Sequence, residues 1–240
     1  CNFRLFKEGN AFYYYAGDRF VGQWFLDEGH FLKGKVFLEC INSAYHKEEQ
    51  DWLATLHASA VSDGKSVLLL AGNSGSGKST AVSVLLANGF LYHSDDFVPL
   101  DASNQNVYPF PVAISVKEGA FDMLSALYPD LHSTPVNAYK FNKQKIKYLA
   151  PSISNYNNRT GQPVKGIVFI SYQEGAQTVL KEMSKSEAFQ RLVTQSWISP
   201  MRRTVELFMN WFKAVPCYQL RYSDNKTMVE AVRDLFQDEA

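Results

Sequence analysis

Eight consecutive residues, beginning at Gly72, carry the residue types that bind the phosphates of a nucleotide: they match G-x-x-x-x-G-K-[ST] at every fixed position. Glycines let the backbone turn sharply, so that successive N–H groups point at an anion. Lys78 is placed to reach the outer phosphates, and the Ser79 hydroxyl is a ligand for Mg²⁺. The predicted phosphate-binding residues are Gly72, Asn73, Ser74, Gly75, Ser76, Gly77, Lys78, Ser79 and Thr80.

The segments on both sides of this loop fit the same prediction. Residues 66–71 form a short apolar run that indicates a buried strand. Residues 78–87 are long enough for a short helix, which Asn88-Gly89 ends. Strand, glycine loop and helix are the context that the motif requires, and the helix N-terminus adds partial positive charge. We therefore predict a nucleotide phosphate site; a glycine-rich surface loop is the alternative.

Two adjacent carboxylates, Asp95 and Asp96, follow the apolar segment 90–94 directly after that helix. A strand in this place ends at the edge of the sheet that carries the phosphate loop. One carboxylate there can hold a metal ion, while the other accepts a proton from an attacking hydroxyl. The alternative is an Asp pair in a solvated turn. Glu118 is a further candidate metal ligand or an exposed acid at a strand end.

Three alternating lysines offer a second source of positive charge. They share one face of an extended segment and either clamp phosphates or line a solvated edge strand. These residues are Lys143, Lys145 and Lys147.

The remaining elements predict an α/β protein with a mixed sheet. We expect one domain over residues 1–240, with a β-meander over 1–45 covering a nucleotide-binding core over 46–240. A loop that enters a further strand is expected over 108–117, and strands are expected over 164–172 and 217–223. The meander strands are expected at 3–6, 11–16, 19–26 and 35–40, and helices at 47–56, 119–130, 184–197, 203–214 and from 227 onward.

Composition excludes several classes of protein. Twenty-four basic and twenty-four acidic residues cancel, so no overall charge favours nucleic acid or an anionic membrane. No apolar run approaches the roughly 20 residues of a membrane span, and the first residues lack the pattern of a signal peptide. Three widely spaced cysteines indicate reduced thiols and neither a disulfide framework nor a zinc site. We expect a cytoplasmic protein.

The spacing of three features resembles the catalytic domain of the HPr kinase/phosphorylase family. His57 stands fifteen residues before the first glycine of the loop, and Asp96 lies eighteen residues after Lys78, as the second of an Asp pair. The similar block covers about residues 57–96. The family's Glu-Ile-Arg-Gly-Leu-Gly segment has no counterpart, and residues 109–116 occupy about its place.

The resemblance implies a phosphoenolpyruvate-carboxykinase-like P-loop fold and an ATP- and Mg²⁺-dependent kinase. Asp96 would then be the base that deprotonates a serine of a protein or peptide, with His57 beside the reacting phosphate and Lys78 on the phosphates. Ser79 and Asp95 are the expected metal ligands. Two alternatives stay open: a kinase of small molecules such as sugars or nucleosides, and a nucleotide-binding regulatory module without catalysis. A homo-oligomer is compatible with the sequence.

Overall fold

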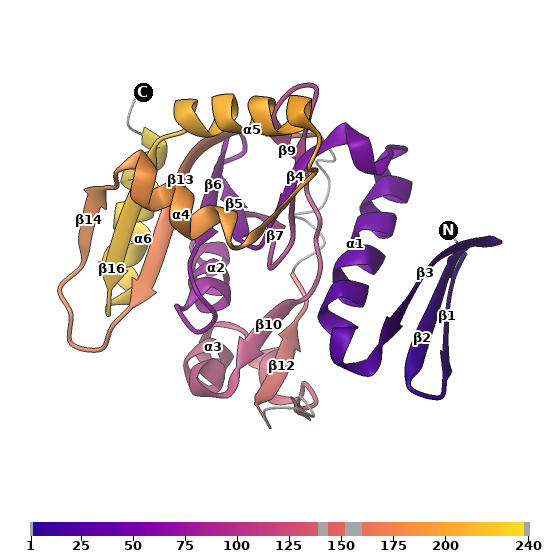
Figure 1. Cartoon of the computed structure of the whole chain (residues 1–240). Helices are drawn as coiled ribbons and strands as arrows, with labels where there is room; N and C mark the ends of the chain where they lie inside the picture. The colour runs from indigo at the N-terminus through magenta and orange to yellow at the C-terminus, as the bar shows by residue number, and fades with distance from the viewer. Residues whose placement is uncertain (1, 139–143, 152–159, 238–240) are drawn as a thin grey trace. The chain divides into compact units, whose positions relative to one another are not determined.

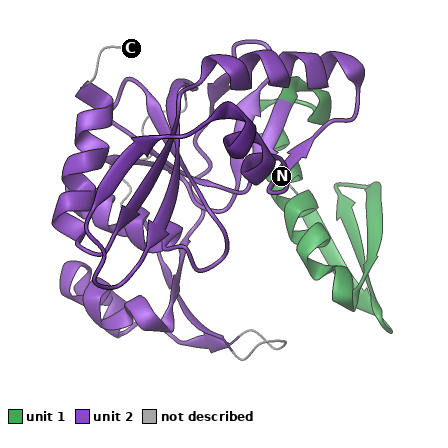
Figure 2. Ribbon diagram, turned by 60° about the vertical axis from the view of Figure 1, so that its left-hand side comes forward, with its two compact units in different colours: residues 1–52 green, residues 53–240 purple. Residues whose placement is uncertain are grey.

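The computed structural model describes residues 2–138, 144–151 and 160–237 of the chain. The chain divides into two compact units, residues 1–52 and 53–240 (Figure 2). The division falls within a strand, beyond the border after residue 45 that the sequence indicated. Each unit is described by itself below.

Unit 1 begins with a three-stranded antiparallel sheet in the order β1-β2-β3, as expected for the start of a meander. Tight turns at Gly9 and Gly17, both with positive φ, join the strands. The strands are β1 (Phe3–Glu8), β2 (Ala11–Ala16) and β3 (Arg19–Phe25).

The strand predicted over residues 35–40 is wrong, because these residues belong to helix α1, Gly29–Tyr45. Leu32, Leu38 and Ile41 are buried and recur at helical spacing, which the short apolar run around Phe37 obscured. The helix ends at His46, whose φ of 52° is left-handed.

The helix predicted over 47–56 is also wrong. A short 3₁₀ turn, η2 (Glu49–Asp51), leads into strand β4, Trp52–Leu56, in which every residue is buried. A strand that is buried on both faces reads as a continuous apolar run, and periodicity alone does not separate such a run from a helix.

Unit 2 is built on a ten-stranded mixed sheet, most of whose strands are labelled in Figure 1. Eight strands run in the order β15-β4-β8-β9-β13-β6-β5-β7, and β16 pairs with both β13 and β14. The strands not yet given are β5 (Ser59–Ser62), β6 (Val67–Ala71), β7 (Leu91–Ser94), β8 (Val98–Asp101), β9 (Asn106–Val107), β13 (Gln162–Tyr172), β14 (Val179–Glu182), β15 (Ser196–Ile198) and β16 (Cys217–Tyr222).

The strand directions bring several loops to one edge of this sheet. β6, β13 and β16 are mutually parallel, so their carboxyl ends lie together. β5 runs antiparallel to both β6 and β7, so β7 points the same way as β6. The loop after β6, the Asp pair after β7 and the residues just before β5 therefore meet at the same edge.

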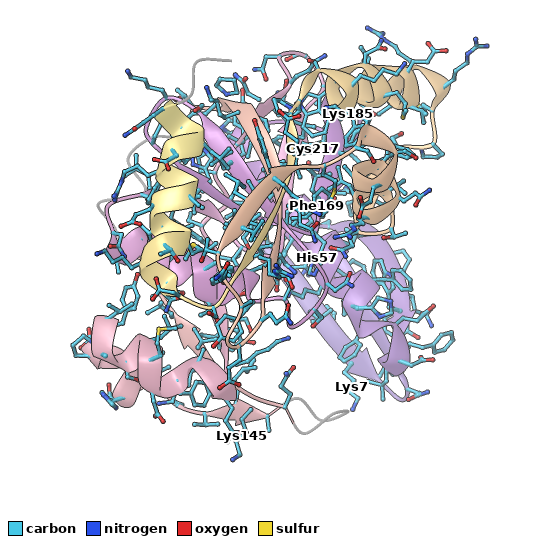
Figure 3. The ribbon with its side chains drawn as sticks, turned by 90° about the vertical axis from the view of Figure 1, so that its left-hand side faces the viewer. Lys7, His57, Lys145, Phe169, Lys185 and Cys217 are labelled. Atoms are coloured by element: carbon cyan, nitrogen blue, oxygen red, sulfur yellow. The ribbon has the colours of Figure 1, made fainter. Side chains whose placement is uncertain are left out.

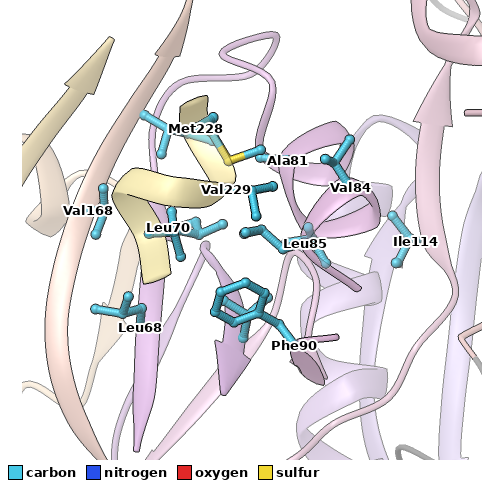
Figure 4. Packing of buried hydrophobic residues seen from close by; sticks show 14 of the residues in the cluster. Leu68, Leu70, Ala81, Val84, Leu85, Phe90, Ile114, Val168, Met228 and Val229 are labelled. Carbon is cyan, nitrogen blue, oxygen red and sulfur yellow. The ribbon is translucent and has the colours of Figure 1, made fainter. Parts of the chain in front are cut away.

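Helices cover both faces of the sheet, and alternate residues of β6 serve the two cores. Leu68 and Leu70 pack with α2 and α6 (Figure 4), whereas Leu69 belongs to the cluster beneath α4 and α5. The helix predicted over 184–197 ends at residue 193, and the strand β15 follows. The helices are α2 (Lys78–Ala87), α3 (Phe121–Leu127), α4 (Lys185–Val193), α5 (Arg202–Ala214) and α6 (Asn225–Gln237).

A separate small antiparallel sheet has the order β10-β12-β11, with β10 at Ile114–Lys117, β12 at Lys145–Leu149 and β11 at Asn137–Ala138. Of the three alternating lysines, Lys143 lies outside the described residues. Among the helices that the structure describes, none is long and apolar enough to cross a membrane.

Candidate active site

The loop after β6 turns back on itself before entering α2. Gly72 has a φ of 152°, and a Cβ there would lie 2.6 Å from Ser76 Oγ and 3.0 Å from the Ile170 carbonyl oxygen. Gly77, with a φ of 97°, precedes the first residue of α2. Both positions favour glycine for conformation and for space, since a Cβ on Gly77 would lie 3.1 Å from the Tyr222 hydroxyl oxygen. The result is a loop that presents the N-terminus of α2 to an anion.

Lys78, the first residue of α2, folds its side chain back over this loop. Its Nζ donates to the Gly72 carbonyl oxygen at 2.6 Å and lies 3.4 Å from that of Asn73. Burial lowers the pKa of Lys78, while the carboxylates of Asp96 and Asp95 act in the opposite direction. The ammonium group is held beside the loop, within the same site as both aspartates.

Asp95 points inward and is buried. Its two oxygens accept hydrogen bonds from the hydroxyls of Ser59 at 2.5 Å and Ser79 at 2.9 Å. Burial is the largest cause that raises the pKa of Asp95 to about 6, followed by repulsion from Asp96. The Ser79 hydroxyl and the Asp95 carboxylate therefore share one contact at the base of the phosphate loop.

These two groups fit a magnesium site. Mg²⁺ prefers oxygen ligands, keeps several waters and uses only one or two protein groups beside the phosphates. Within the described residues no group of three or more His, Cys, Asp or Glu forms a self-contained metal site. Ser79 and Asp95 thus place two oxygen groups of the type that Mg²⁺ accepts side by side at the base of the loop.

Asp96 points the other way, toward solvent and His57. Its φ of 64° is left-handed, a conformation that Asp tolerates better than most residues. This backbone conformation lets two adjacent carboxylates occupy different environments. His57 Nδ1 lies 3.1 Å from the Asp96 carbonyl oxygen, and His57 Nε2 lies 3.9 Å from Asp96 Oδ1. Both side chains remain partly exposed.

A cavity of about 610 Å³ is lined by Lys78, Ser79, Asp96 and His57, and its volume lies within the range of small-ligand and cofactor sites. The sequence-predicted residues that line it are His57, Ser74, Gly75, Gly77, Lys78, Ser79, Thr80 and Asp96. The predicted residues outside this lining are Gly72, Asn73, Ser76 and Asp95.

The structure places the other candidate residues elsewhere. Glu118 forms an ion pair with Lys145 at 2.7 Å, and neither residue lines the cavity. Figure 3 shows Lys145 well separated from His57. Lys147 donates to the Leu131 carbonyl oxygen at 2.7 Å. Neither of these two lysines therefore clamps a ligand in this cavity.

Sequence analysis missed Lys117, at the end of β10. Its Nζ donates to Ser74 Oγ at 3.0 Å, and the side chain lines the cavity beside Lys78. The only signal in the sequence was the position of this lysine directly before Glu118, a residue that the sequence indicated as a candidate metal ligand.

Gln195, between α4 and β15, was missed as well. Its backbone carbonyl oxygen accepts a hydrogen bond from the backbone N–H of His57 at 2.7 Å. Its side-chain Nε2 donates to Asn73 Oδ1 at 2.9 Å. One residue thus connects the segment that carries His57 to the phosphate loop. No sequence pattern marked it, because its role arises only from the pairing of β15 with β4.

No family model matches the chain, and no curated protein matches it in sequence. Among solved structures, the chain is similar to the HPr(Ser) kinase/phosphatase from Coxiella burnetii, with 11% sequence identity and a TM-score of 0.37. The similarity covers 76% of this chain and 90% of that chain. The function proposed below therefore rests on the site's own geometry.

Proposed function

We propose that this protein is an ATP- and Mg²⁺-dependent kinase that transfers the γ-phosphate to a hydroxyl group. The observation that carries the proposal is the convergence of Lys78, Asp96 and His57 on one cavity at the mouth of a glycine loop. A cation for the phosphates and a partly exposed carboxylate for the attacking hydroxyl are the parts that phosphoryl transfer needs.

In the proposed reaction, loop N–H groups and Lys78 hold the polyphosphate, and Asp96 accepts the proton of the attacking hydroxyl. The hydroxyl oxygen forms a bond to the γ-phosphorus as the bond to the β,γ-bridging oxygen breaks, and ADP leaves. We assign to His57 a position beside the transferred phosphate, because its Nε2 lies 3.9 Å from Asp96 Oδ1.

Mg²⁺, held by Ser79 and Asp95, would neutralise charge on the phosphate oxygens. The buried position of Asp95 and its hydrogen bond from Ser59 fix that carboxylate against Ser79. Asp95 is thereby oriented for holding the metal together with Ser79, which leaves the proton transfer to Asp96.

The acceptor that we propose is a serine of a protein or peptide. The acceptor end of the cavity supports this choice, since the side chains of His57 and Asp96 are 48% and 29% exposed. A hydroxyl that is carried on a polypeptide can approach from solvent without entering the phosphate loop.

The test is incubation of the full chain with γ-labelled ATP, Mg²⁺ and lysate of the source cell, followed by identification of the labelled species. Asp96→Asn keeps the left-handed conformation accessible and removes the base. We expect it to lower transfer at least about 100-fold while ATP affinity is retained. Lys78→Ala should lose both phosphoryl transfer and ATP binding.

Each of the other outcomes would assign a different function or a different base to this protein. Equal transfer by Asp96→Asn contradicts the assigned base. Label on a small molecule instead of a polypeptide makes the protein a small-molecule kinase. ATP binding without any Lys78-dependent labelling leaves a regulatory module that binds nucleotide.

A further inference from the structure

The last residue of β13 continues a row of side chains that is otherwise buried. Val168 and Ile170 face the core beneath α2 and are 0% and 4% exposed. Tyr172 is next on the same face of the strand, because side chains alternate along it. It is 52% exposed. The row thus ends in a large aromatic ring that reaches past the core.

The backbone of Tyr172 is fixed at the phosphate loop, and its ring packs against Tyr222. Its backbone N–H donates to the Ser76 carbonyl oxygen at 3.0 Å, and its Cβ lies 3.3 Å from where a Cβ on Gly77 would be. The buried Tyr222 packs edge-on against it, with ring centroids 5.7 Å apart and planes at 76°. An edge-on neighbour leaves ring surface available to a further partner.

The cavity lining includes residues next to strands on both sides of β6. The acceptor group His57 lies between β4 and β5, and Asp96 lies between β7 and β8. These residues flank the paired ends of β5 and β7, two strands on one side of β6 in the sheet order. Tyr172 comes from β13, on the other side of β6. The phosphate loop, which follows β6, lies between them. The strand β16, which pairs with β13, ends at Tyr222, and this residue also lines the cavity. Ser223 and Asn225, which follow β16, and Met123 of α3 line it as well.

We propose that Tyr172 is the platform on which the nucleobase of the bound nucleotide stacks. The inference rests on the proposed function, since it assumes that the phosphates occupy the glycine loop. With the terminal phosphate toward Asp96, the other end of the nucleotide extends toward β13, where an exposed ring is already in place. The side-chain amide of Asn225, which contacts Met123 Sδ at 3.7 Å, lies at the start of α6 in the same lining.

Stacking adds affinity that an inorganic polyphosphate does not have. Loss of one base–aromatic stack typically weakens binding about tenfold or more. Since every base has a π-face, the gain applies to ATP and GTP alike. The donor of the proposed kinase is accordingly a nucleoside triphosphate, and inorganic polyphosphates should bind more weakly.

The experiment compares ATP with tripolyphosphate, each with Mg²⁺, by isothermal titration calorimetry on the full chain. We expect Tyr172→Ala to weaken ATP binding about tenfold and to leave tripolyphosphate binding unchanged. Tyr172→Phe, which retains the ring, is the matched control and should bind ATP like the wild type. GTP should follow the same pattern.

Four results would overturn the inference. Unchanged ATP affinity in Tyr172→Ala, or an equal loss for ATP and tripolyphosphate, removes the base platform and leaves the phosphate site intact. If the wild type binds ATP no better than tripolyphosphate, the base platform is likewise removed and the phosphate site remains. If the wild type binds neither ligand, the phosphate site itself fails, and the proposed function fails with it.

Discussion

Two neighbouring carboxylates in this protein have opposite surroundings. Asp95 is buried and accepts hydrogen bonds from Ser59 and Ser79, while Asp96 is partly exposed beside His57. The left-handed backbone at Asp96 makes this division possible. Strain of this kind is common at functional sites, where it fixes a side chain in a required direction. One aspartate is thereby suited to a metal and the other to a proton.

A residue-scale prediction concerns Lys117, the second cation of the cavity. Lys117→Ala should weaken tripolyphosphate binding about tenfold, because a charge-assisted contact with a phosphate oxygen is lost. Lys145→Ala is the matched control, since that lysine pairs with Glu118 outside the cavity and should leave affinity unchanged. Calorimetry on both variants decides the point; equal affinities for Lys117→Ala and the wild type would contradict it.

The residues that sequence analysis placed and those that it missed differ in one respect. Gly77, Lys78 and Asp96 belong to a short continuous block whose spacing itself carries information. Lys117, Tyr172 and Gln195 come from separate segments, and only the pairing of strands brings them to the site. A single lysine, tyrosine or glutamine has no local signature, so no pattern in the sequence distinguished these three.

At the scale of elements, the phosphate loop depends on the space around Gly72. Gly72→Ala should lower the free energy of unfolding by about 1–2 kcal/mol more than Gly89→Ala does. Both positions have positive φ, but only Gly72 faces Ser76 Oγ and the Ile170 carbonyl oxygen, whereas a Cβ on Gly89 meets nothing within 4 Å. Denaturant titration of the two variants measures the difference, and equal losses would show that crowding at Gly72 is unimportant.

The sequence also predicted some elements better than others. The strand β6, the helix α2 and the turn after it were predicted because loop motif, apolar run and helix stop all agree locally. Part of helix α1 was predicted as a strand, and the residues of strand β4 were predicted as a helix. Short apolar runs fit both the helical and the strand period, and burial on two faces removes the alternation of a strand. Local agreement, more than apolar content, made an element predictable.

At the scale of the whole molecule, unit 1 has its own buried polar group. The Tyr14 hydroxyl has no hydrogen-bond partner among the described residues, and burial raises the pKa of Tyr14 to about 12 from 10.0. The folded state thus favours the protonated phenol. The associated stability is present below the unfolded pKa of 10.0 and is lost as pH rises toward 12.

Tyr14→Phe tests this account. The wild type should lose about 1 kcal/mol of stability between about pH 9 and pH 11 through this one group. The variant should lack that component and should be at least as stable at neutral pH, because an unpaired buried hydroxyl is removed. Denaturant unfolding followed by circular dichroism at both pH values measures it. The same fall with pH in both proteins would refute the role of Tyr14.

The most direct test of the central claim is a crystal structure of the full chain with Mg²⁺ and a non-hydrolysable ATP analogue. The account predicts the triphosphate in the loop at residues 72–79, with Lys78 on its outer phosphates and the Asp96 carboxylate one bridging water or hydroxyl from the terminal phosphate. A triphosphate bound elsewhere, or one whose terminal phosphate lies beyond such a bridge from Asp96, would contradict it.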